Sequence, residues 1–251
     1  MDNRRKFLQK SLLTLGGALA GTSLLSAKET SNIGGSKKIT INHNDVILFQ
    51  GDSITDNGRK RDNLEPNNTD AFGKGYAMIA ASNLLNKYAD KNIQVYNRGI
   101  SGNKVPQLAE RWDTDCIALK PTILSIMIGI NDYWHKRNGN YEGSANAYKD
   151  QYRKLLDQTL TALPQVKLII GEPFGVKNVK HVDDSWFPEL TQYQQVANEI
   201  AKEYHAVFLP YQSIFDKAEK RANGKYWTTD GVHTTLAGAN LMAQHWIETV
   251  K

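Results

Sequence analysis

Short apolar runs alternate along the chain with longer stretches in which apolar residues recur every three or four positions. Five runs have the length and the β-favouring composition of buried strands, and they span residues 46–49, 93–96, 122–128, 166–170 and 206–209. The stretches with helical periodicity are 71–85, 104–119, 145–163, 189–204, a segment after Ser213, and 236–250. Strands that alternate with helices predict an α/β fold, with a parallel sheet covered on both faces and joined by right-handed crossovers.

The last helical stretch has a clear apolar face. This face consists of Leu236, Ala239, Ala243, Trp246, Ile247 and Val250. We expect all of these side chains to pack against the sheet.

The first 27 residues have the pattern of an export signal peptide. The basic pair Arg4-Arg5 precedes an uncharged apolar stretch, residues 12–25, and the small residues Ser26 and Ala27 follow. Paired arginines favour the twin-arginine route. The apolar stretch is shorter than the roughly 20 residues that a spanning helix needs, although a retained N-terminal anchor is an alternative. We therefore expect an exported protein, periplasmic or secreted, without membrane contact after signal removal.

Residues 28–45 are polar and contain Gly34, Gly35 and Ser36, so they are expected to form a flexible lead-in, with 39–41 as a candidate edge strand. No linker divides the remainder. Residues 46–251 are therefore predicted to form one domain, which is large enough to bury a sizeable core.

The charge of the chain argues against nucleic acid as a partner. The formal net charge is +5, and the basic residues of the signal account for most of it. The mature protein keeps about +2, and it has no basic run interleaved with aromatic residues.

Cysteine and histidine usage argues against a metal centre. The single cysteine, Cys116, cannot form an internal disulfide. It lies on an expected helix, which favours a buried structural thiol. No group of cysteines and histidines has the spacing of a metal site, so we expect neither a metal nor another cofactor.

Small polar residues follow the first three strands, where parallel sheets place their ligands. Ser53 comes just after the first strand, Gly102 lies in the loop after the second, and Asn131 follows the third. Taken singly, each of these stretches is as typical of a turn or a helix cap as of a site.

A fourth stretch, Thr229 to His233, precedes the last helix. Together, the four stretches contain the groups that ester hydrolysis through a serine requires. Ester hydrolysis through a serine needs a base to accept the hydroxyl proton, and a group that orients this base. Asp230 and His233 are close enough for one loop to present both to Ser53. The backbone N–H groups of Ser53 and Gly102, with the Asn131 amide, would supply donors for the oxyanion.

In this order, the four stretches resemble the sequence blocks of the SGNH/GDSL hydrolase family. The matching residues are Gly51-Asp52-Ser53, Gly102, Gly129 to Asp132, and Asp230 to His233, and the resemblance extends from about Val46 to the end of the chain. It implies a three-layer α/β/α, flavodoxin-like fold with a five-stranded parallel sheet. It also implies a catalytic triad and an oxyanion hole, formed by Ser53, Asp230 and His233 and by Ser53, Gly102 and Asn131, respectively.

Two residues depart from the family pattern without affecting these roles. Ile54 stands where the family name has leucine, and Thr234 follows His233 where proline is common.

Further residues resemble the acetylxylan-esterase branch of the family. They are residues 51–56, 58–59, 99–103, 111–112 and 126–132, together with Trp134. This branch implies removal of acetyl groups from xylose units through an acyl-enzyme intermediate.

Aromatic residues near these stretches are candidates for binding a sugar. Trp134 and Trp186 could form a wall for the apolar face of a sugar ring, while packing in the core or at a subunit contact is the alternative for each. Because a subunit contact is one of these alternatives, the protein could form a homo-oligomer. His135 lies near Asn131 as a rival base, but it has no acidic residue at a useful local spacing.

The sequence thus predicts a metal-independent serine esterase for short acyl esters, with acetylated carbohydrate, xylan or xylo-oligosaccharide, as the favoured substrate. Two alternatives stay open. One is a lysophospholipase or thioesterase of the same fold, and the other is a non-catalytic carbohydrate-binding relative.

Overall fold

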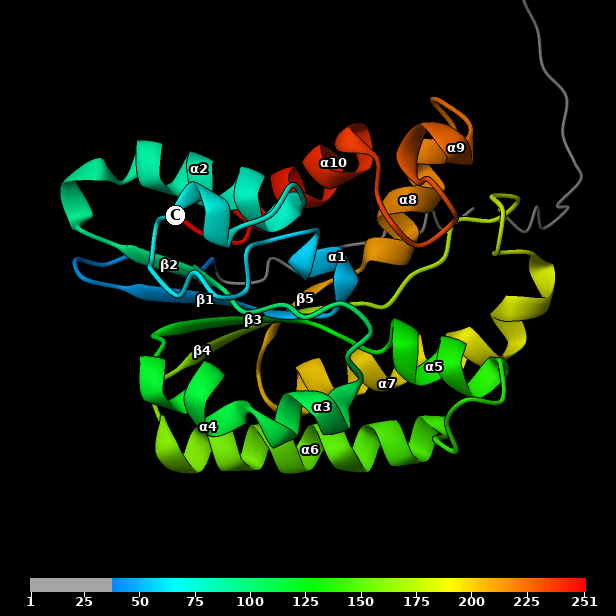
Figure 1. The fold of residues 1–251 in the computed structure, drawn as a ribbon, viewed down its shortest axis with the longest axis horizontal. Coiled ribbons are helices and arrows are strands. Elements are labelled where there is room, and N and C mark those ends of the chain that lie inside the picture. The colour runs from blue at the N-terminus through cyan, green and yellow to red at the C-terminus, as the bar shows by residue number, and fades with distance from the viewer. Residues whose placement is uncertain (1–37) are drawn as a thin grey trace, which may run out of the picture. The chain divides into compact units, whose positions relative to one another are not determined.

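A five-stranded, fully parallel sheet forms the centre of the computed structural model, which describes residues 38–251 (Figure 1). The strand order is β2-β1-β3-β4-β5. The strands are β1 (Val46–Gly51), β2 (Gln94–Asn97), β3 (Ile123–Met127), β4 (Lys167–Gly171) and β5 (Val207–Leu209). This flavodoxin-like order confirms the predicted fold. The expected export signal, residues 1–27, lies outside the described residues.

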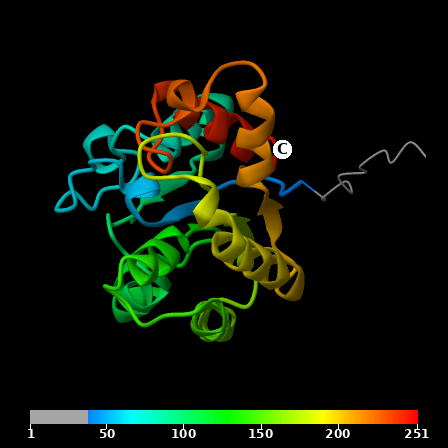
Figure 2. The ribbon, with the colours of Figure 1, turned by 90° about the vertical axis from the view of Figure 1, so that its right-hand side faces the viewer.

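Helices cover the sheet on both faces, as Figures 1 and 2 show from two directions. On one face lie α2 (Tyr76–Lys87), α8 (Tyr211–Glu219), α9 (Gly224–Trp227) and α10 (Leu236–Ile247). On the other face lie α3 (Val105–Glu110), α4 (Trp112–Asp115), α5 (Ile130–Arg137), α6 (Ala145–Ala162) and α7 (Phe187–Glu203). The result is a three-layer α/β/α arrangement.

The strand order reverses between β1 and β3, and this places a crevice at their carboxyl ends. The register pairs Gly51 with Met127 at this edge. A Cβ atom on Gly51 would lie 2.2 Å from the carbonyl oxygen of Met127. Only glycine therefore permits this close approach of the two strand ends from which the site is built.

Aromatic side chains join the sheet to the helices above and below it. The ring of Phe49 lies 5.8 Å from that of Tyr76 and 4.9 Å from that of Trp246, measured between centroids. On the other face, the indole N–H of Trp112 donates to the Thr159 hydroxyl at 2.9 Å. Burial of these large side chains supplies the main driving force that fixes the layers.

The helix expected over residues 104–119 is broken into three pieces. The segments α3 and α4 flank Arg111, and a 3₁₀ turn, η3 (Ile117–Leu119), follows Cys116. Arg111 has a backbone conformation outside the helical region, with φ −117° and ψ 11°. Cys116 is buried and unpaired, which agrees with a structural thiol.

Two other helix starts differ from the expectation. The stretch expected to begin at Ala71 instead forms a short 3₁₀ turn, η1 (Thr69–Ala71), and α2 begins only at Tyr76. Gly73 separates the two because its φ of +74° is not helical. The helix placed after Ser213 begins two residues earlier, at Tyr211, directly after a proline.

The last helix, α10, ends at Ile247, and its first residue does not belong to the apolar face. Leu236 was expected to pack on the sheet, but 78% of its surface is exposed. Leu236 is the first residue of α10.

The described part of the expected lead-in packs against the domain. The N–H groups of Ile39 and Ile41 donate to the carbonyls of Thr249 and Lys251, each at 2.9 Å, and Ile41 is fully buried. Residues 39–41 thus pair with the C-terminal segment through an isolated parallel bridge instead of forming an edge strand of the sheet.

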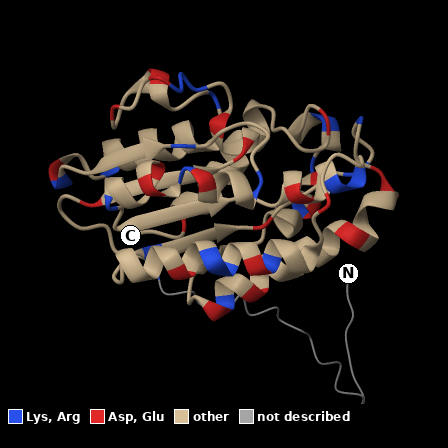
Figure 3. Cartoon of the chain, turned by 60° about the horizontal axis from the view of Figure 1, so that its bottom comes forward, with Lys and Arg blue, Asp and Glu red and all other residues tan. Residues whose placement is uncertain are grey.

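Positions of basic and acidic residues are interspersed along the helices seen in Figure 3. Two ion pairs link α6 to α7, Lys149 with Glu199 at 2.5 Å and Arg153 with Glu203 at 2.7 Å. This mixed distribution differs from the basic stripe that nucleic-acid binding requires. Along residues 38–251, no helix combines the length and the apolar character needed to cross a membrane.

Candidate active site

Ser53 is the first residue of a one-turn helix, α1 (Ser53–Asp56), that starts directly after β1. Asp52 caps this turn, because its Oδ1 accepts a hydrogen bond from the N–H of Ile54 at 2.9 Å. Asp52 is fully buried, and burial raises the pKa of its carboxyl group to about 7. Asp52 therefore holds the turn, and the half-buried Ser53 hydroxyl faces the crevice.

Three side chains from distant parts of the sequence form one hydrogen-bonded row. The Ser53 Oγ lies 2.8 Å from the Nε2 of His233. On the other side of the ring, the Nδ1 of His233 lies 2.7 Å from the Oδ2 of Asp230. This arrangement has the geometry that serine hydrolysis requires of a nucleophile, a base and an orienting acid.

The loop before α10 is folded around the Asp230 carboxylate. Its Oδ1 accepts hydrogen bonds from the backbone N–H groups of Val232 at 2.9 Å and His233 at 2.8 Å. Because one oxygen binds the backbone and the other binds the imidazole, the ring of His233 has a fixed orientation.

The electrostatics of the pair favour a charged imidazole. The hydrogen bond to Asp230 raises the pKa of His233 above its usual value, against the opposing effect of burial. Burial alone would raise the pKa of Asp230, but its hydrogen bonds with His233 and Val232 hold this pKa well below its usual range. Asp230 thus stays anionic beside His233, and an anion in this place favours the protonated form of the imidazole.

Three candidate donors for a negatively charged oxygen lie in the segments that follow β1, β2 and β3. Asn131 lies in the first turn of α5, and its side-chain N–H₂ donates to the carbonyl of Asn103 at 3.1 Å, which fixes the amide and leaves its second hydrogen free. The N–H groups of Ser53 and Gly102 have no acceptor among residues 38–251. Gly102 has a φ of +83°, which glycine adopts without strain. These are the three donors predicted for the oxyanion hole, and that role stays a prediction.

Residues that support Asn131 were not recognised in the sequence. The Nε of Arg111 donates to the side-chain oxygen of Asn103 at 3.0 Å, so it steadies the loop whose carbonyl binds Asn131. The Oδ1 of Asp132 accepts from the N–H of Val105 at 3.1 Å and ties α5 to α3. These partners were not predictable from the sequence, because the contacts join side chains and backbone groups of different elements that meet only in the folded chain.

The two tryptophans proposed to bind substrate have different environments. Trp134 is partly exposed, and its ring centroid lies 6.5 Å from that of His233. Trp186 is buried, with only 2% of its surface exposed, and its ring centroid lies 5.2 Å from that of Trp134. The expectation for Trp186 is thus corrected: it has no face for a sugar and instead supports Trp134 from behind.

His135, the rival base, does not join the row of Ser53 and His233. Its Nδ1 lies 3.4 Å from the Nζ of Lys104. Burial, and then the charge of Lys104, lower the pKa of His135.

A cavity of about 560 Å³ opens over Ser53. Its lining is polar and consists of Ser53, Asn57, Gly58, Lys74, Ser101, Thr229, His233 and Thr234. The volume is in the range of small-ligand sites. Within residues 38–251, no group of three or more histidine, cysteine and acidic side chains could hold a metal ion.

Comparisons with known proteins find related sequences and structures. A model of the GDSL-like Lipase/Acylhydrolase family matches residues 49–241. An acetylxylan esterase from Geobacillus stearothermophilus is 34% identical over 212 residues, which cover 84% of this chain and 95% of that protein.

Two crystal structures are similar over most of the chain. A putative GDSL-like lipase from Parabacteroides merdae ATCC 43184 has 44% identity and a TM-score of 0.83, over 84% of this chain and 98% of its own. Axe2, an acetylxylan esterase from Geobacillus stearothermophilus, has 32% identity and a TM-score of 0.75, over 83% of this chain and 95% of its own.

Proposed function

The chain belongs to the GDSL-like lipase/acylhydrolase family and is a carboxylic ester hydrolase, and we propose that it removes acetyl groups from acetylated xylan or xylo-oligosaccharides. One observation carries the chemistry: the Ser53 Oγ lies 2.8 Å from the His233 Nε2 in a row that ends at Asp230. The similarity to an acetylxylan esterase supports the choice of substrate.

In the proposed reaction, the Ser53 Oγ attacks the acetyl carbonyl while the Nε2 of His233 accepts the hydroxyl proton. The N–H groups of Ser53 and Gly102 and the amide of Asn131 stabilise the oxyanion of the tetrahedral intermediate. His233 then gives its proton to the departing sugar oxygen, which leaves an acetyl ester on Ser53. A water molecule that is deprotonated by His233 hydrolyses this ester and restores the free serine.

The walls of the cavity support a sugar leaving group. Thr229, Lys74 and Asn57 offer hydrogen-bonding groups to sugar hydroxyls, and all three line the cavity. The partly exposed ring of Trp134 provides an apolar surface beside His233, and such a surface suits the C–H face of a pyranose. The signal pattern at residues 1–27 suits an exported enzyme that meets polysaccharide outside the cytoplasm.

The test compares two substrate classes at equal concentration. The protein is incubated with acetylated xylo-oligosaccharides and, separately, with a long-chain lysophospholipid, and released acetate and fatty acid are quantified. We expect acetate release to dominate by at least tenfold in kcat/KM. Preferential release of fatty acid would replace the proposal with a lysophospholipase. Glycan binding without hydrolysis of either substrate would instead favour a non-catalytic carbohydrate-binding relative.

A further inference from the structure

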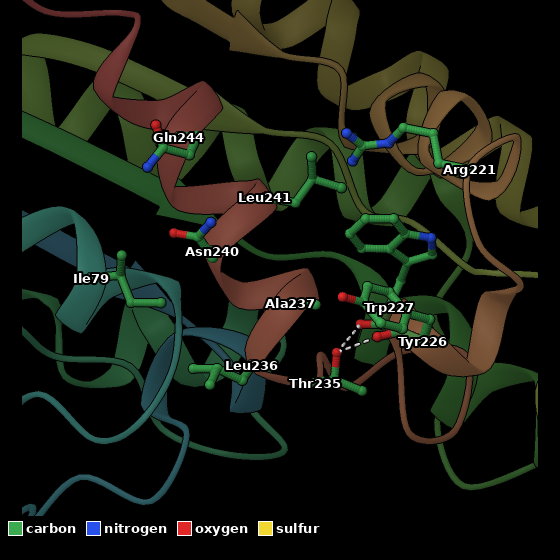
Figure 4. A pocket seen from close by; sticks show the side chains of 10 residues that line it. All are labelled: Ile79, Arg221, Tyr226, Trp227, Thr235, Leu236, Ala237, Asn240, Leu241 and Gln244. Atoms are coloured by element: carbon green, nitrogen blue, oxygen red, sulfur yellow. Dashed lines mark hydrogen bonds between the residues drawn. The ribbon is translucent and has the colours of Figure 1, made fainter.

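A second and larger hollow lies on the side of the domain that carries α2, α9 and α10. It has a volume of about 1060 Å³. Figure 4 shows its lining, which consists of Ile79, Arg221, Tyr226, Trp227, Thr235, Leu236, Ala237, Asn240, Leu241 and Gln244. We call this hollow the α10 groove. It shares no lining residue with the cavity over Ser53.

Exposed apolar side chains cluster in the α10 groove. Three large hydrophobic residues are exposed among residues 38–251, and two of them, Tyr226 at 57% and Leu236 at 78%, line the groove. The ring of Tyr226 stands edge-on to that of Trp227, with centroids 4.9 Å apart and planes at 82°. A cluster of this kind marks a binding surface more often than isolated exposed residues do.

Polar side chains with free hydrogen-bonding groups flank this apolar surface. Asn240 and Gln244 lie one helical turn apart on α10, and both are exposed. Within the described part of the chain, neither amide makes a hydrogen bond, and Arg221 has no ion pair but lies 5.0 Å from the Trp227 ring centroid. Of the residues that the structure describes, no acidic one lines the groove.

This combination fits a neutral polyhydroxylated chain better than it fits a lipid. A sugar ring has apolar C–H faces that pack on aromatic and aliphatic side chains, and hydroxyl groups at its edge that bind amides. An acyl chain would leave the amides and the guanidinium without partners, which carries a cost when they are covered.

Consecutive residues of one segment line the cavity over Ser53 and the α10 groove. Thr234 lines the cavity over Ser53, and the next two residues, Thr235 and Leu236, line the α10 groove. The segment is held in place because the hydroxyl of Thr235 donates to the carbonyl of Tyr226 at 2.6 Å (Figure 4). A glycan chain that lies in the groove can therefore extend along this segment towards His233.

We propose that the α10 groove binds the backbone of an acetylated xylan-type glycan and presents its acetylated units to Ser53. The inference rests on the proposed function and adds that the enzyme recognises a polymer several sugar units long. It predicts that KM falls as the glycan chain lengthens, whereas a small acetate ester gains nothing from the groove.

The test uses Tyr226→Ala and the double variant Asn240→Ala/Gln244→Ala, with Leu64→Ala as the matched control. Leu64 is 57% exposed, as Tyr226 is, but it does not line the groove. Each purified protein is assayed on polymeric acetylated xylan and on 4-nitrophenyl acetate. We expect KM for the polymer to rise roughly three- to tenfold in both groove variants. Activity on the small ester, and both activities of Leu64→Ala, should stay within about twofold of wild type.

Binding is measured separately so that the two proposals can fail independently. Ser53→Ala, which retains the groove, is titrated with deacetylated xylohexaose by calorimetry, alone and combined with Tyr226→Ala. Binding to Ser53→Ala that is lost in the combined variant supports the groove even if the wild type proves inactive on acetylated xylan. Polymer kinetics that Tyr226→Ala leaves unchanged would overturn the proposal. A groove variant that instead changes the mass of the protein in size-exclusion chromatography would also overturn it and would identify a contact between copies of the chain.

Discussion

Ser101 is bound twice by the same oxygen of Asp56. Its backbone N–H and its hydroxyl each lie 2.8 Å from the Oδ2 of Asp56, 45 residues away in sequence. Asp56 ends α1, the turn that begins with Ser53. Ser101 directly precedes Gly102. One buried carboxylate therefore fixes the spacing between the proposed nucleophile and a proposed oxyanion donor.

The first prediction follows from this link. Asp56→Asn keeps the shape of the side chain but loses the charge and one of its acceptor oxygens, so the loop with Gly102 should loosen. We expect kcat to fall by roughly tenfold with a smaller change in KM, since the donor acts mainly on the transition state. The control is Asp70→Asn, which removes a surface carboxylate paired with Lys60 and should leave kcat unchanged. A rise in KM alone would show that the loop binds substrate in the ground state.

The second prediction concerns the nucleophile. Ser53→Ala should reduce ester turnover by roughly 10⁴-fold or more, because among residues 38–251 no other hydroxyl forms a hydrogen bond with the imidazole ring of His233. The thermal midpoint should change little, since Ser53 is half-buried and its hydroxyl faces the cavity. Ser213→Ala is the matched control: it removes a serine hydroxyl that only donates to Pro210 within α8. A folded Ser53→Ala protein with near wild-type turnover would refute the assignment.

The third prediction is a shift of the pH profile. Catalysis needs neutral His233, and the hydrogen bond to Asp230 raises the pKa of this residue above its ordinary value. The acid limb of kcat/KM should therefore lie at a higher pH in the wild type than an unperturbed histidine would give. Asp230→Asn removes the charge that favours the imidazolium, so the midpoint of the limb should move to lower pH. At the same time the plateau should drop by roughly 10⁴-fold. If the midpoint of the acid limb does not move in Asp230→Asn, the limb reflects the titration of a group other than His233.

The fourth prediction ranks two residues of α5. Asn131→Ala should lower kcat by roughly a hundredfold or more, with a smaller effect on KM. His135→Ala should have a much smaller effect, because His135 contacts Lys104 and not Ser53. Initial rates across a range of concentrations of one acetate ester separate the two parameters. His233→Ala should be at least as damaging as Asn131→Ala, and a larger loss of kcat in His135→Ala than in His233→Ala would make His135 the base.

The strands were predictable from the sequence because a parallel strand is buried on both faces and reads as an unbroken apolar run. All five residues of β3 are buried, including Ser125. The boundaries of the helices were harder to predict from the sequence. Arg111 breaks the helix expected over 104–119 while its guanidinium binds the carbonyl of Arg98 and the side chains of Asn103 and Asp115. A periodic pattern cannot report such contacts.

The order of the four sequence blocks was enough to nominate Ser53, Asp230 and His233 together, since each block precedes or follows a recognisable element. The environment of single side chains was not predictable. Trp134 and Trp186 look equivalent in the sequence, but Trp186 is enclosed by Tyr133 and Trp134 from another helix and is buried. The link between Asp56 and Ser101 likewise depends on two loops that meet only in the folded chain.

The last prediction concerns acyl chain length. A long acyl chain needs a continuous apolar lining near the nucleophile. The cavity over Ser53 is lined by hydroxyl, amide, ammonium and imidazole groups together with a glycine, and none of the described residues 38–251 contributes a large aliphatic side chain to it. Each additional methylene group therefore forgoes up to about 0.8 kcal/mol of favourable transfer, and it must also fit against fixed polar walls.

We expect kcat/KM to fall by roughly tenfold or more from acetyl to butyryl esters of one common alcohol, and further to octanoyl. Keeping the alcohol constant holds the leaving group fixed, so that the series reports the acyl side alone. Spontaneous hydrolysis is measured for each ester and subtracted. Ser53→Ala gives the enzyme-independent baseline. A maximum at octanoyl would require an apolar path that the cavity lining does not contain, and it would favour the lipase-like alternative over the acetyl esterase.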